Sequence, residues 1–484
     1  MTAVCCSGRC LGCCAWCGSR RSLARRAQCR AVLPVLLVLL GAGYGAALSG
    51  AWLGWTLLGA ALCGGLQDVL GRRSVIALSV PLQVAAVLVH AWLVQEPEEA
   101  VLDGVALGVR LVRSACSGVA LGLALPAALF YLAELWRGAR RGAVCCVPAI
   151  AVLAGRTLAY GLEEAVRAAD APPRVATLAG LAPGCLGLLL LLLLAPPSPF
   201  WLALRGREVA LASSIARIRG LRDERGARDE AEDVAYTVRE QRASLCAGNW
   251  RGPLLSLLLV GGMPLAGVPL LEAHLPAVLS PFGEDVADGG RWAWLVRVSF
   301  GGALVLAVAV VALLTDRCGR RPLVAAACLV LAAGHATLGY FHWFLGTPLP
   351  PRATLAWYIT LGALSVAAVA GAALSALAWL VIAEVLPVRA KAVVPSLALL
   401  LALVLQSSLD ALHEALPVAL LWAEDEDSPL ERRWPAAWCW AHSLWCLLLA
   451  LVVAVLLPET KGFSLAQLHE IFRGPNRQNM RTRL

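Results

Sequence analysis

Charged residues are scarce in this sequence. Of its 484 residues, 15% are Asp, Glu, Lys or Arg, whereas 59% are hydrophobic. A soluble domain of this length carries closer to a quarter charged residues. The shortage therefore argues against an ordinary soluble protein and indicates a membrane protein.

Signatures of secretion, glycosylation and catalysis are also missing. The sequence has no Asn-x-Ser/Thr sequon, and Arg20 to Arg30 separate its start from the first apolar run, which argues against a cleavable signal peptide. The histidines show no metal-ligand spacing, and there is no Ser/His/Asp order or phosphate loop. We therefore expect no enzyme activity, no cofactor and no metal site.

Long apolar runs dominate what is present. A membrane-spanning helix needs about 20 mainly apolar residues, and its backbone polar groups must pair within the segment. Twelve runs qualify: 31–49, 52–67, 74–94, 105–133, 143–162, 176–195, 253–273, 292–314, 322–344, 355–382, 393–416 and 436–457. We predict an all-α membrane protein with twelve transmembrane helices in the lipid bilayer.

The gaps between these runs sort by charge. Basic gaps contain Arg20 to Arg30, Arg72 and Arg73, Arg137 to Arg141, Arg205 to Arg222, Arg317 to Arg321, Arg389 with Lys391, and Arg473 to Arg483. The alternate gaps are acidic, as at Glu163 and Glu164 or in the run Glu424–Asp427. Because basic loops stay in the cytoplasm, we expect both termini in the cytoplasm. The protein itself is expected in the plasma membrane or an intracellular vesicle membrane. The net charge of +9 is then explained by the basic cytoplasmic loops, and we expect no nucleic-acid partner.

The N-terminal segment is rich in cysteine. Its members are Cys5, Cys6, Cys10, Cys13, Cys14, Cys17 and Cys29. Their spacing could suggest a zinc site, and a basic segment beside a membrane helix also suits S-palmitoylation. A basic tail without chemistry is the third interpretation, and the sequence leaves all three open.

An internal repeat divides the chain into two halves. Asp68-Val-Leu-Gly-Arg72-Arg73 follows the second run, and Asp316-Arg-Cys-Gly-Arg320-Arg321 follows the eighth. In a second repeat, Glu134 and Arg141 follow run four, and Glu384 and Arg389 follow run ten. Two related six-helix halves are typical of transporters that rock about a central site. The polar stretch between the halves predicts short amphipathic helices.

The repeated motif has a mechanical interpretation. Its Asp can accept hydrogen bonds at a helix end, its Gly permits a tight turn, and its Arg pair can bind carboxylates such as those of Glu134 and Glu384. These charges could instead only set the topology, but two copies at matching places favour a contact that forms in one conformation and breaks in another. We predict a cytoplasmic latch made of Asp68, Arg72, Arg73, Glu134, Arg141, Asp316, Arg320, Arg321, Glu384 and Arg389.

At these residues the chain resembles the sugar porter family of the major facilitator superfamily. Further agreement comes from Gly43-Tyr44, Tyr131…Glu134, Pro196-Pro-Ser-Pro-Phe-Trp-Leu202 and Pro458-Glu-Thr-Lys-Gly462. The resemblance covers about residues 40–470 and implies two six-helix bundles in the major facilitator fold. The expected domains are a tail at 1–30, bundles at 31–197 and 253–458, a linker at 198–252 and a tail at 459–484.

Departures from the family concern the solute site. Gly45 stands where symporters of the family carry a proton-linked Asp, which favours a uniporter. Aligned with the family, Ala149, Met263, Pro264 and Pro269 replace polar sugar contacts, although Trp379 remains. A buried hydroxyl without a partner costs about 1–3 kcal/mol, so these losses weaken the case for hexose binding.

Polar residues inside the spans are the remaining candidates for solute contact. Arg156 lies within run five, where an Arg costs about 2.5–3.5 kcal/mol at a helix centre and should face the bundle or water. It could line the cavity and favour an anionic solute, or it could snorkel or pair with Glu163. Gln83 and Gln406 could contact solute, but an interhelical hydrogen bond is the simpler interpretation.

We therefore expect facilitative uniport of a hexose-like sugar, with a monosaccharide as partner. The candidate solute contacts are Arg156, Met263, Trp379 and Gln406. Two alternatives stay open, namely transport of another polar or anionic solute, and a carrier-derived protein that senses solute without moving it.

Overall fold

The computed structural model describes residues 30–47, 53–93, 103–136, 138–220, 224–241, 250–268, 291–345, 355–421 and 429–473. All regular elements in these ranges are helices. The N-terminal cysteine cluster and Pro269 lie outside them.

Ten described helices are long and apolar enough to cross a membrane. They are Arg30–Ala47, Arg72–Trp92, Leu107–Leu135, Gly138–Ala168, Arg174–Leu194, Arg297–Cys318, Arg320–Phe344, Ile359–Val385, Ala390–Leu412 and Ala436–Leu456. Helix α2 (Leu53–Leu70) takes the second place in this order, and the shorter apolar helix Arg251–Gly261 takes the seventh. The order thus reproduces the twelve predicted segments.

The N-terminal half contains the helix Arg30–Ala47 and α2 to α8. Its other elements are α3 (Arg72–Leu93), α4 (Asp103–Leu135), α5 (Gly138–Cys145), α6 (Val147–Ala168), α7 (Arg174–Ala179) and α8 (Leu181–Leu194). The fifth and sixth predicted spans are therefore each divided into two helices. Pro148 at the start of α6 fits this division, because proline is tolerated in the first turn of a helix.

The C-terminal half contains α12 to α19. Its elements are α12 (Arg251–Ser256), the π-helical turn η1 (Leu257–Gly261), the 3₁₀ turn η2 (Pro264–Ala266), α15 (Arg291–Cys318), α16 (Arg320–Leu345), α17 (Leu355–Val385), α18 (Ala390–Leu421) and α19 (Pro429–Leu456). The seventh span is interrupted where the sequence predicted one helix. Pro264 lacks an N–H donor, and Gly267 has a left-handed φ of 71°.

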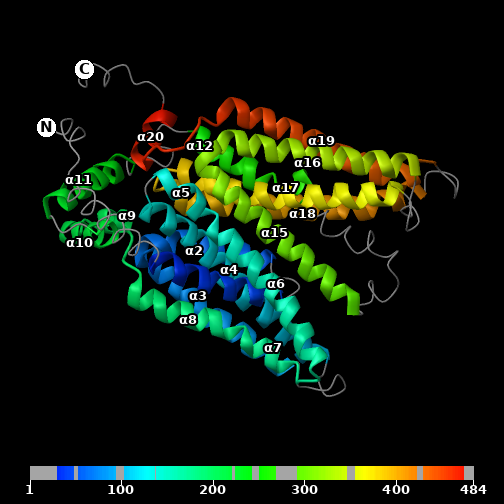
Figure 1. The fold of residues 1–484 in the computed structure, drawn as a ribbon, viewed down its shortest axis with the longest axis horizontal. Coiled ribbons are helices and arrows are strands. Elements are labelled where there is room, and N and C mark those ends of the chain that lie inside the picture. Colours follow the sequence, from blue (N-terminus) through cyan, green and yellow to red (C-terminus); the bar gives the residue numbers. More distant parts are fainter. Residues whose placement is uncertain are drawn as a thin grey trace, which may run out of the picture.

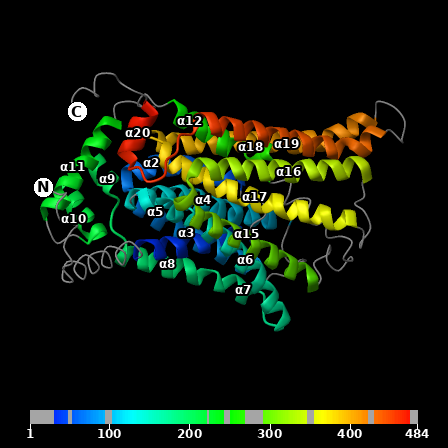
Figure 2. The same cartoon turned by 45° about the horizontal axis from the view of Figure 1, so that its top comes forward.

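The two halves lie side by side, with the first half running from blue through cyan to sea green and the second from green to red (Figures 1 and 2). Helix α2 packs against α18, and α5 and α6 pack against α15. The core of the second half also takes in Leu129 and Phe130 of α4 and Cys145 and Cys146 of the first half. The interface between the halves is therefore continuous with a buried apolar core.

Short helices gather at one end of the molecule, here called the linker end (Figures 1 and 2). They are α9 (Pro199–Leu204), α10 (Glu208–Arg219), α11 (Glu224–Gln241) and α20 (Leu465–Arg473). The Ser198 side chain caps α9 by accepting a hydrogen bond of 3.3 Å from the Trp201 amide. The predicted short linker helices are present, and they cover this end of both halves.

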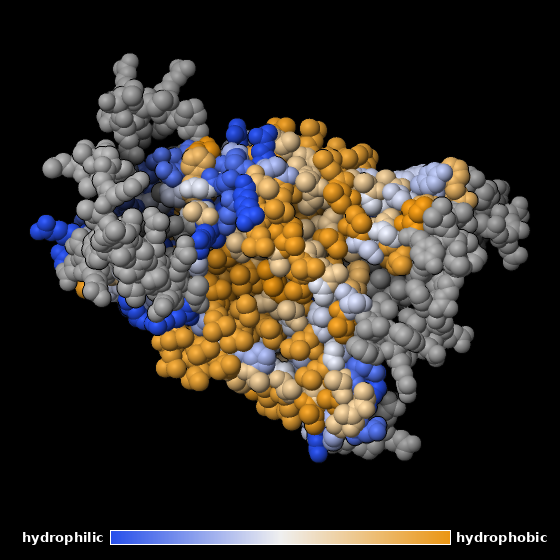
Figure 3. All heavy atoms as spheres, viewed as in Figure 1, coloured by the Kyte–Doolittle hydropathy of each residue, from blue (hydrophilic) through white to orange (hydrophobic). Residues whose placement is uncertain are grey.

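Exposed aliphatic side chains line the outside of the long helices. Leu193 of α8, Leu313 of α15 and Val455 of α19 are 65%, 67% and 71% exposed. On the face shown in Figure 3, apolar residues form a belt beside the hydrophilic residues of the linker end. An apolar surface of this extent fits contact with lipid rather than water.

Candidate functional site

The repeated motif builds two matching turns at the linker end. Gly71 and Gly319 sit at these turns with φ of 90° and 100°, in the left-handed region that favours glycine. Each turn starts the next helix with two arginines. The first arginine of each pair, Arg72 or Arg320, is fully buried. A buried guanidinium needs a carboxylate partner, and both find one.

The Glu134 cluster is formed around a fully buried carboxylate at the end of α4. The Nε of Arg72 lies 3.2 Å from Glu134 Oε2. The Ser198 hydroxyl donates a hydrogen bond to the same oxygen. The Nζ of Lys391, on α18 of the other half, lies 3.8 Å from Oε1. One glutamate thus contacts an arginine of its own half, a hydroxyl at the start of the linker and a cation of the opposite half.

The Glu384 cluster repeats this plan at the end of α17. Arg320 Nη2 donates to Glu384 Oε1 at 3.2 Å, and Thr460 Oγ1 donates to Oε2 at 2.6 Å. The cation from the opposite half is Arg141 of α5, whose Nε donates to Oε1 at 2.9 Å. Its Nη2 also donates to the Phe463 carbonyl at 3.1 Å.

A further contact joins the halves at Asp316. This carboxylate accepts hydrogen bonds from the backbone amides of Gly142 and Ala143, at 3.1 and 3.0 Å, and pairs with Arg320 at 3.0 Å. The corresponding Asp68 lies 3.8 Å from Arg72, and its side chain is 46% exposed against 15% for Asp316. The Asp of the second motif therefore bridges the halves, whereas the Asp of the first forms a long ion pair within its own half.

Three of the predicted latch residues lie outside these clusters. Arg73 donates to the carbonyl of Leu192 at the end of α8, and Arg321 donates to the carbonyl of Ala454 at the end of α19. The second arginine of each motif thus binds the C-terminal end of a helix, where the backbone carbonyls lack partners. Arg389 is exposed, and Lys391 occupies the place beside Glu134.

Two hydroxyls in the clusters were not among the predicted site residues. Ser198 lies in the stretch Pro196–Leu202, and Thr460 lies in Pro458–Gly462. Both stretches carried the family resemblance, at matching places after the sixth and twelfth helices. Their positions in the repeat are the signal that could have identified them.

A cavity of about 230 Å³ lies between the two halves. Helices α4, α5 and α6 line it from one side, and Val268, α15 and α17 from the other. Most lining side chains are apolar, such as Leu125, Val152 and Leu304, and Ala149 is among them. The polar contributions come from Arg156, Ser375 and Trp379.

The predicted solute contacts divide into two groups. Arg156 and Trp379 line the cavity, and Met263 reaches it indirectly through a contact of 3.8 Å between its sulfur and the Ser375 hydroxyl. Gln406 is not among the lining residues, and it donates instead to Asp410 one turn along α18 at 2.7 Å. Gln83 donates to Ser79 on its own helix at 3.3 Å.

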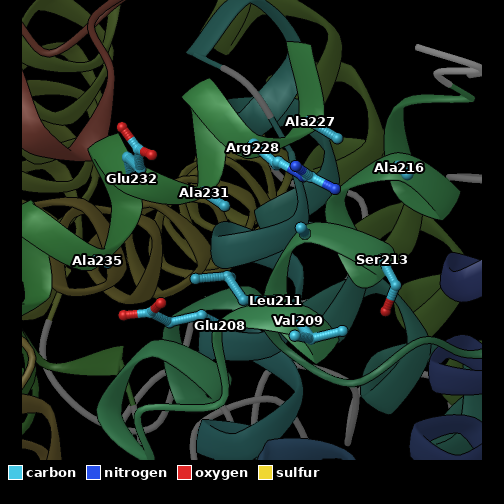
Figure 4. A pocket seen from close by; sticks show the side chains of 11 residues that line it. Glu208, Val209, Leu211, Ser213, Ala216, Ala227, Arg228, Ala231, Glu232 and Ala235 are labelled. Atoms are coloured by element: carbon cyan, nitrogen blue, oxygen red, sulfur yellow. The ribbon is translucent and has the colours of Figure 1, made fainter. Parts of the chain in front are cut away.

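A larger hollow of about 670 Å³ lies away from this cavity, at the linker end. All of its lining residues belong to α10 and α11, including Glu208, Arg228 and Glu232 (Figure 4). None of its lining residues belongs to either six-helix half. A solute that crosses the membrane must pass between the halves, so the smaller cavity is the candidate solute site. Within the described residues, no three His, Cys, Asp or Glu side chains are grouped to hold a metal ion.

Comparison with known proteins agrees with this arrangement. Residues 41–472 match the model of the sugar (and other) transporter family. A human relative, solute carrier family 2 facilitated glucose transporter member 6, is 27% identical over 472 residues, covering 89% of this chain and 84% of that protein. The D-xylose-proton symporter-like 2 protein of Arabidopsis thaliana is 24% identical and covers 89% of this chain and 80% of its own length.

The fold matches a solved transporter. A proton:xylose symporter of the major facilitator superfamily, bound to 6-bromo-6-deoxy-D-glucose, superposes with a TM-score of 0.74 at 18% identity, covering 94% of this chain and all of that one. The predicted fold and family are therefore confirmed. The chain is a multi-pass membrane protein with the major facilitator fold, and it belongs to the sugar (and other) transporter family.

Proposed function

We propose that this protein is a uniporter that moves a hexose-like sugar across the membrane by alternating access. The observation that carries the proposal is that, at the linker end, each half contributes a basic side chain to the buried glutamate of the other half. Arg141 of the first half reaches Glu384, and Lys391 of the second half reaches Glu134. Contacts of this kind hold one end closed and must break for that end to open.

The moving bodies in this proposal are residues 31–197 and 253–458, joined by the linker 198–252 and flanked by the tails 1–30 and 459–484. The linker end faces the cytoplasm, because the basic gaps of the sequence lie there and basic loops stay inside. The solute enters the cavity between the halves from the opposite side. Rocking of the halves then breaks the clusters and releases the solute inward, so the ten residues named from sequence act as a latch in unequal shares.

Uniport is favoured by the helix Arg30–Ala47. Gly45 occupies the place where symporters of the family carry a carboxylate, and glycine cannot bind a proton. Uptake into reconstituted vesicles should therefore run down the sugar gradient and stay unchanged when an inward proton gradient is imposed. Uphill accumulation driven by that gradient would contradict uniport.

The transport test uses radiolabelled glucose, fructose, inositol and urate with purified protein in vesicles. Arg141→Ala should lower uptake of the transported solute by about tenfold or more, because Glu384 loses its partner from the opposite half. Arg140→Ala is the matched control, since Arg140 is the exposed neighbour on the same helix. Equal uptake by both variants would overturn the latch, and no uptake of any solute by the wild type would favour a sensor.

A second candidate function is transport of an organic anion, and Arg156 is the observation that favours it. Arg156 is the one charged residue among those lining the cavity, whose other walls are largely apolar. A cation in an apolar cavity attracts a carboxylate or other anion strongly because the local dielectric is low. Urate uptake lost in Arg156→Ala and kept in Arg156→Lys, with glucose uptake unchanged, would support this candidate. Urate uptake unchanged in Arg156→Ala would exclude it.

A further inference from the structure

The interruption of the seventh span leaves the Leu265 carbonyl without a helical donor. In a continuous helix the Leu265 carbonyl would accept from the N–H of residue 269, but Pro269 has none. The chain also turns at Gly267, which has a left-handed φ of 71°. Inside a membrane such a carbonyl must find a partner on a neighbouring helix.

One side chain of the second half bonds to this carbonyl, and two more bond to its neighbours Ala266 and Gly262, of which Gly262 also accepts from the Ala266 amide at 3.2 Å. His442 Nδ1 lies 2.7 Å from the Leu265 carbonyl oxygen, His335 Nε2 lies 3.0 Å from that of Ala266, and Trp445 Nε1 donates to Gly262 at 3.1 Å. A carbonyl oxygen only accepts, so each histidine carries a proton on the nitrogen that faces it. We call His335, His442 and Trp445 the helix-seven clamp.

The clamp belongs to a rigid part of the second half. His335 lies on α16, and His442 and Trp445 lie on α19, two helices that pack tightly along their lengths. The Ser443 hydroxyl ties them together by donating to the Ala332 carbonyl at 2.8 Å. The two histidine rings lie 5.5 Å apart, and both histidines are buried.

The opposite side of the clamped segment faces the solute cavity. Val268 lines that cavity, and Met263 contacts the cavity residue Ser375. Between them, Gly267 is pressed against the clamp, because a Cβ added there would lie 2.7 Å from His335 and 3.0 Å from His442. The position of the cavity wall at residues 263–268 is thus set from behind by the clamp.

We propose that His335, His442 and Trp445 are positioning residues for solute binding, which act by fixing the backbone of residues 262–268 at the wall of the cavity. The role rests on the proposed transport function, but the clamp itself is a contact that can be tested without any solute. The polar side chains expected from the family at this wall are replaced by Met263 and Pro264. The segment therefore presents backbone groups and apolar side chains to a solute, and the clamp controls where they lie.

The two histidines allow a crossed test, because they use different ring nitrogens. A glutamine amide can place its N–H where the Nε2 of histidine lies, and the shorter asparagine amide can place it near Nδ1. His335→Gln and His442→Asn should therefore keep the bonds to Ala266 and Leu265. His335→Asn and His442→Gln should lose them. Ser443→Ala is the control that weakens the contact between α16 and α19 without touching the seventh span.

The first readout is hydrogen exchange of the full chain in lipid nanodiscs. The amides of Met263, Ala266 and Gly267 are bonded within the segment, and they should exchange about tenfold faster in the two shifted variants. The two matched variants and Ser443→Ala should stay within about twofold of the wild type. Equal exchange in shifted and matched variants, or no change in any variant, would overturn the clamp.

The second readout is glucose uptake by the same variants. The shifted variants should raise KM by about tenfold with a smaller change in maximal rate, and the matched variants should restore it. A fall in maximal rate alone, with KM unchanged, would contradict a role in positioning the solute site. If the wild type moves no glucose, the transport proposal for that sugar fails, while the exchange pattern still decides whether the clamp holds the segment.

Discussion

The Glu384 and Glu134 clusters share one plan but hold the opposite half differently. At Glu384 the cation from across the interface is a guanidinium at 2.9 Å that also binds the Phe463 carbonyl. At Glu134 it is the ammonium of Lys391 at 3.8 Å. The nearby aspartates differ in the same direction, since Asp316 binds two amides of the first half and Asp68 is half exposed.

This difference shows that the two copies of a sequence repeat need not contribute equally to holding the halves together. A guanidinium binds a carboxylate through directed hydrogen bonds, whereas an ammonium at 3.8 Å acts mainly as a point charge. The phenyl rings of Phe130 and Phe200 lie 5.5 and 5.8 Å from the Lys391 nitrogen and supply part of its stabilisation. We therefore expect the Glu384 cluster to carry most of the latch energy.

The largest effect should follow from removing the charge of a cluster glutamate. Glu384→Gln leaves Arg320 and Arg141 buried around a neutral amide, which should cost about 3–5 kcal/mol. Glu134→Gln should cost less, about 2–3 kcal/mol, because its partner from across the interface is farther away. Unfolding temperatures of both variants in detergent test this order. An equal or larger loss in Glu134→Gln would remove the asymmetry.

The next effect concerns the two cations that cross the interface. Arg141→Met should cost about 2–3 kcal/mol, since Glu384 and the Phe463 carbonyl both lose a donor. Lys391→Met should cost about 0–1 kcal/mol, because removing a buried ammonium also removes its desolvation penalty. The same unfolding measurement compares them. A larger loss in Lys391→Met would show that the ammonium is the stronger tie.

A smaller effect is expected at the motif aspartates. Asp316→Asn should cost about 1–2 kcal/mol, because one of its two acceptor oxygens becomes an NH₂ group facing the amide of Gly142 or Ala143. Asp68→Asn should change stability by about 0.5 kcal/mol or less, since its ion pair is long and half exposed. Exchange rates of the Gly142 and Ala143 amides provide the readout. Faster exchange in Asp68→Asn than in Asp316→Asn would reverse the comparison.

The smallest effects should come from the second arginines, and here the halves should behave alike. Arg73→Gln and Arg321→Gln each remove an exposed bond to the last turn of a helix, worth about 0.3–1 kcal/mol. The two unfolding temperatures should shift equally. A difference as large as that between Glu384→Gln and Glu134→Gln would mean that one of these arginines carries a large share of the latch energy.

Much of the fold could be predicted because lipid leaves the backbone few choices. The predicted runs 322–344 and 355–382 correspond to α16 at Arg320–Leu345 and α17 at Leu355–Val385. Apolar composition alone determines such helices. Division of the fifth span into α5 and α6 and the π turn at Leu257–Gly261 were not predicted, because they depend on tertiary packing. Helices α5 and α6 pack against α15 of the opposite half, and the π turn packs against α18 of its own half.

The site could be predicted in part for a similar reason. Arg72, Arg320, Glu134 and Glu384 meet as the repeat predicted, since a buried charge must pair with another. Arg73 and Arg321 have the same charge, but their partners are helix ends whose positions the sequence does not reveal. The helix-seven clamp was not predicted because its acceptors are backbone carbonyls, which every residue has and which the sequence therefore does not distinguish.

The most direct measurement is the distance across the linker end during transport. Spin labels attached through unnatural amino acids at the exposed positions Arg140 of α5 and Arg317 of α15 leave the native cysteines in place. Double electron–electron resonance in nanodiscs should show two distances between the labels. The shorter distance should dominate in the wild type and the longer one in Glu384→Gln. A single distance that is the same in both proteins would contradict a latch that opens between the halves.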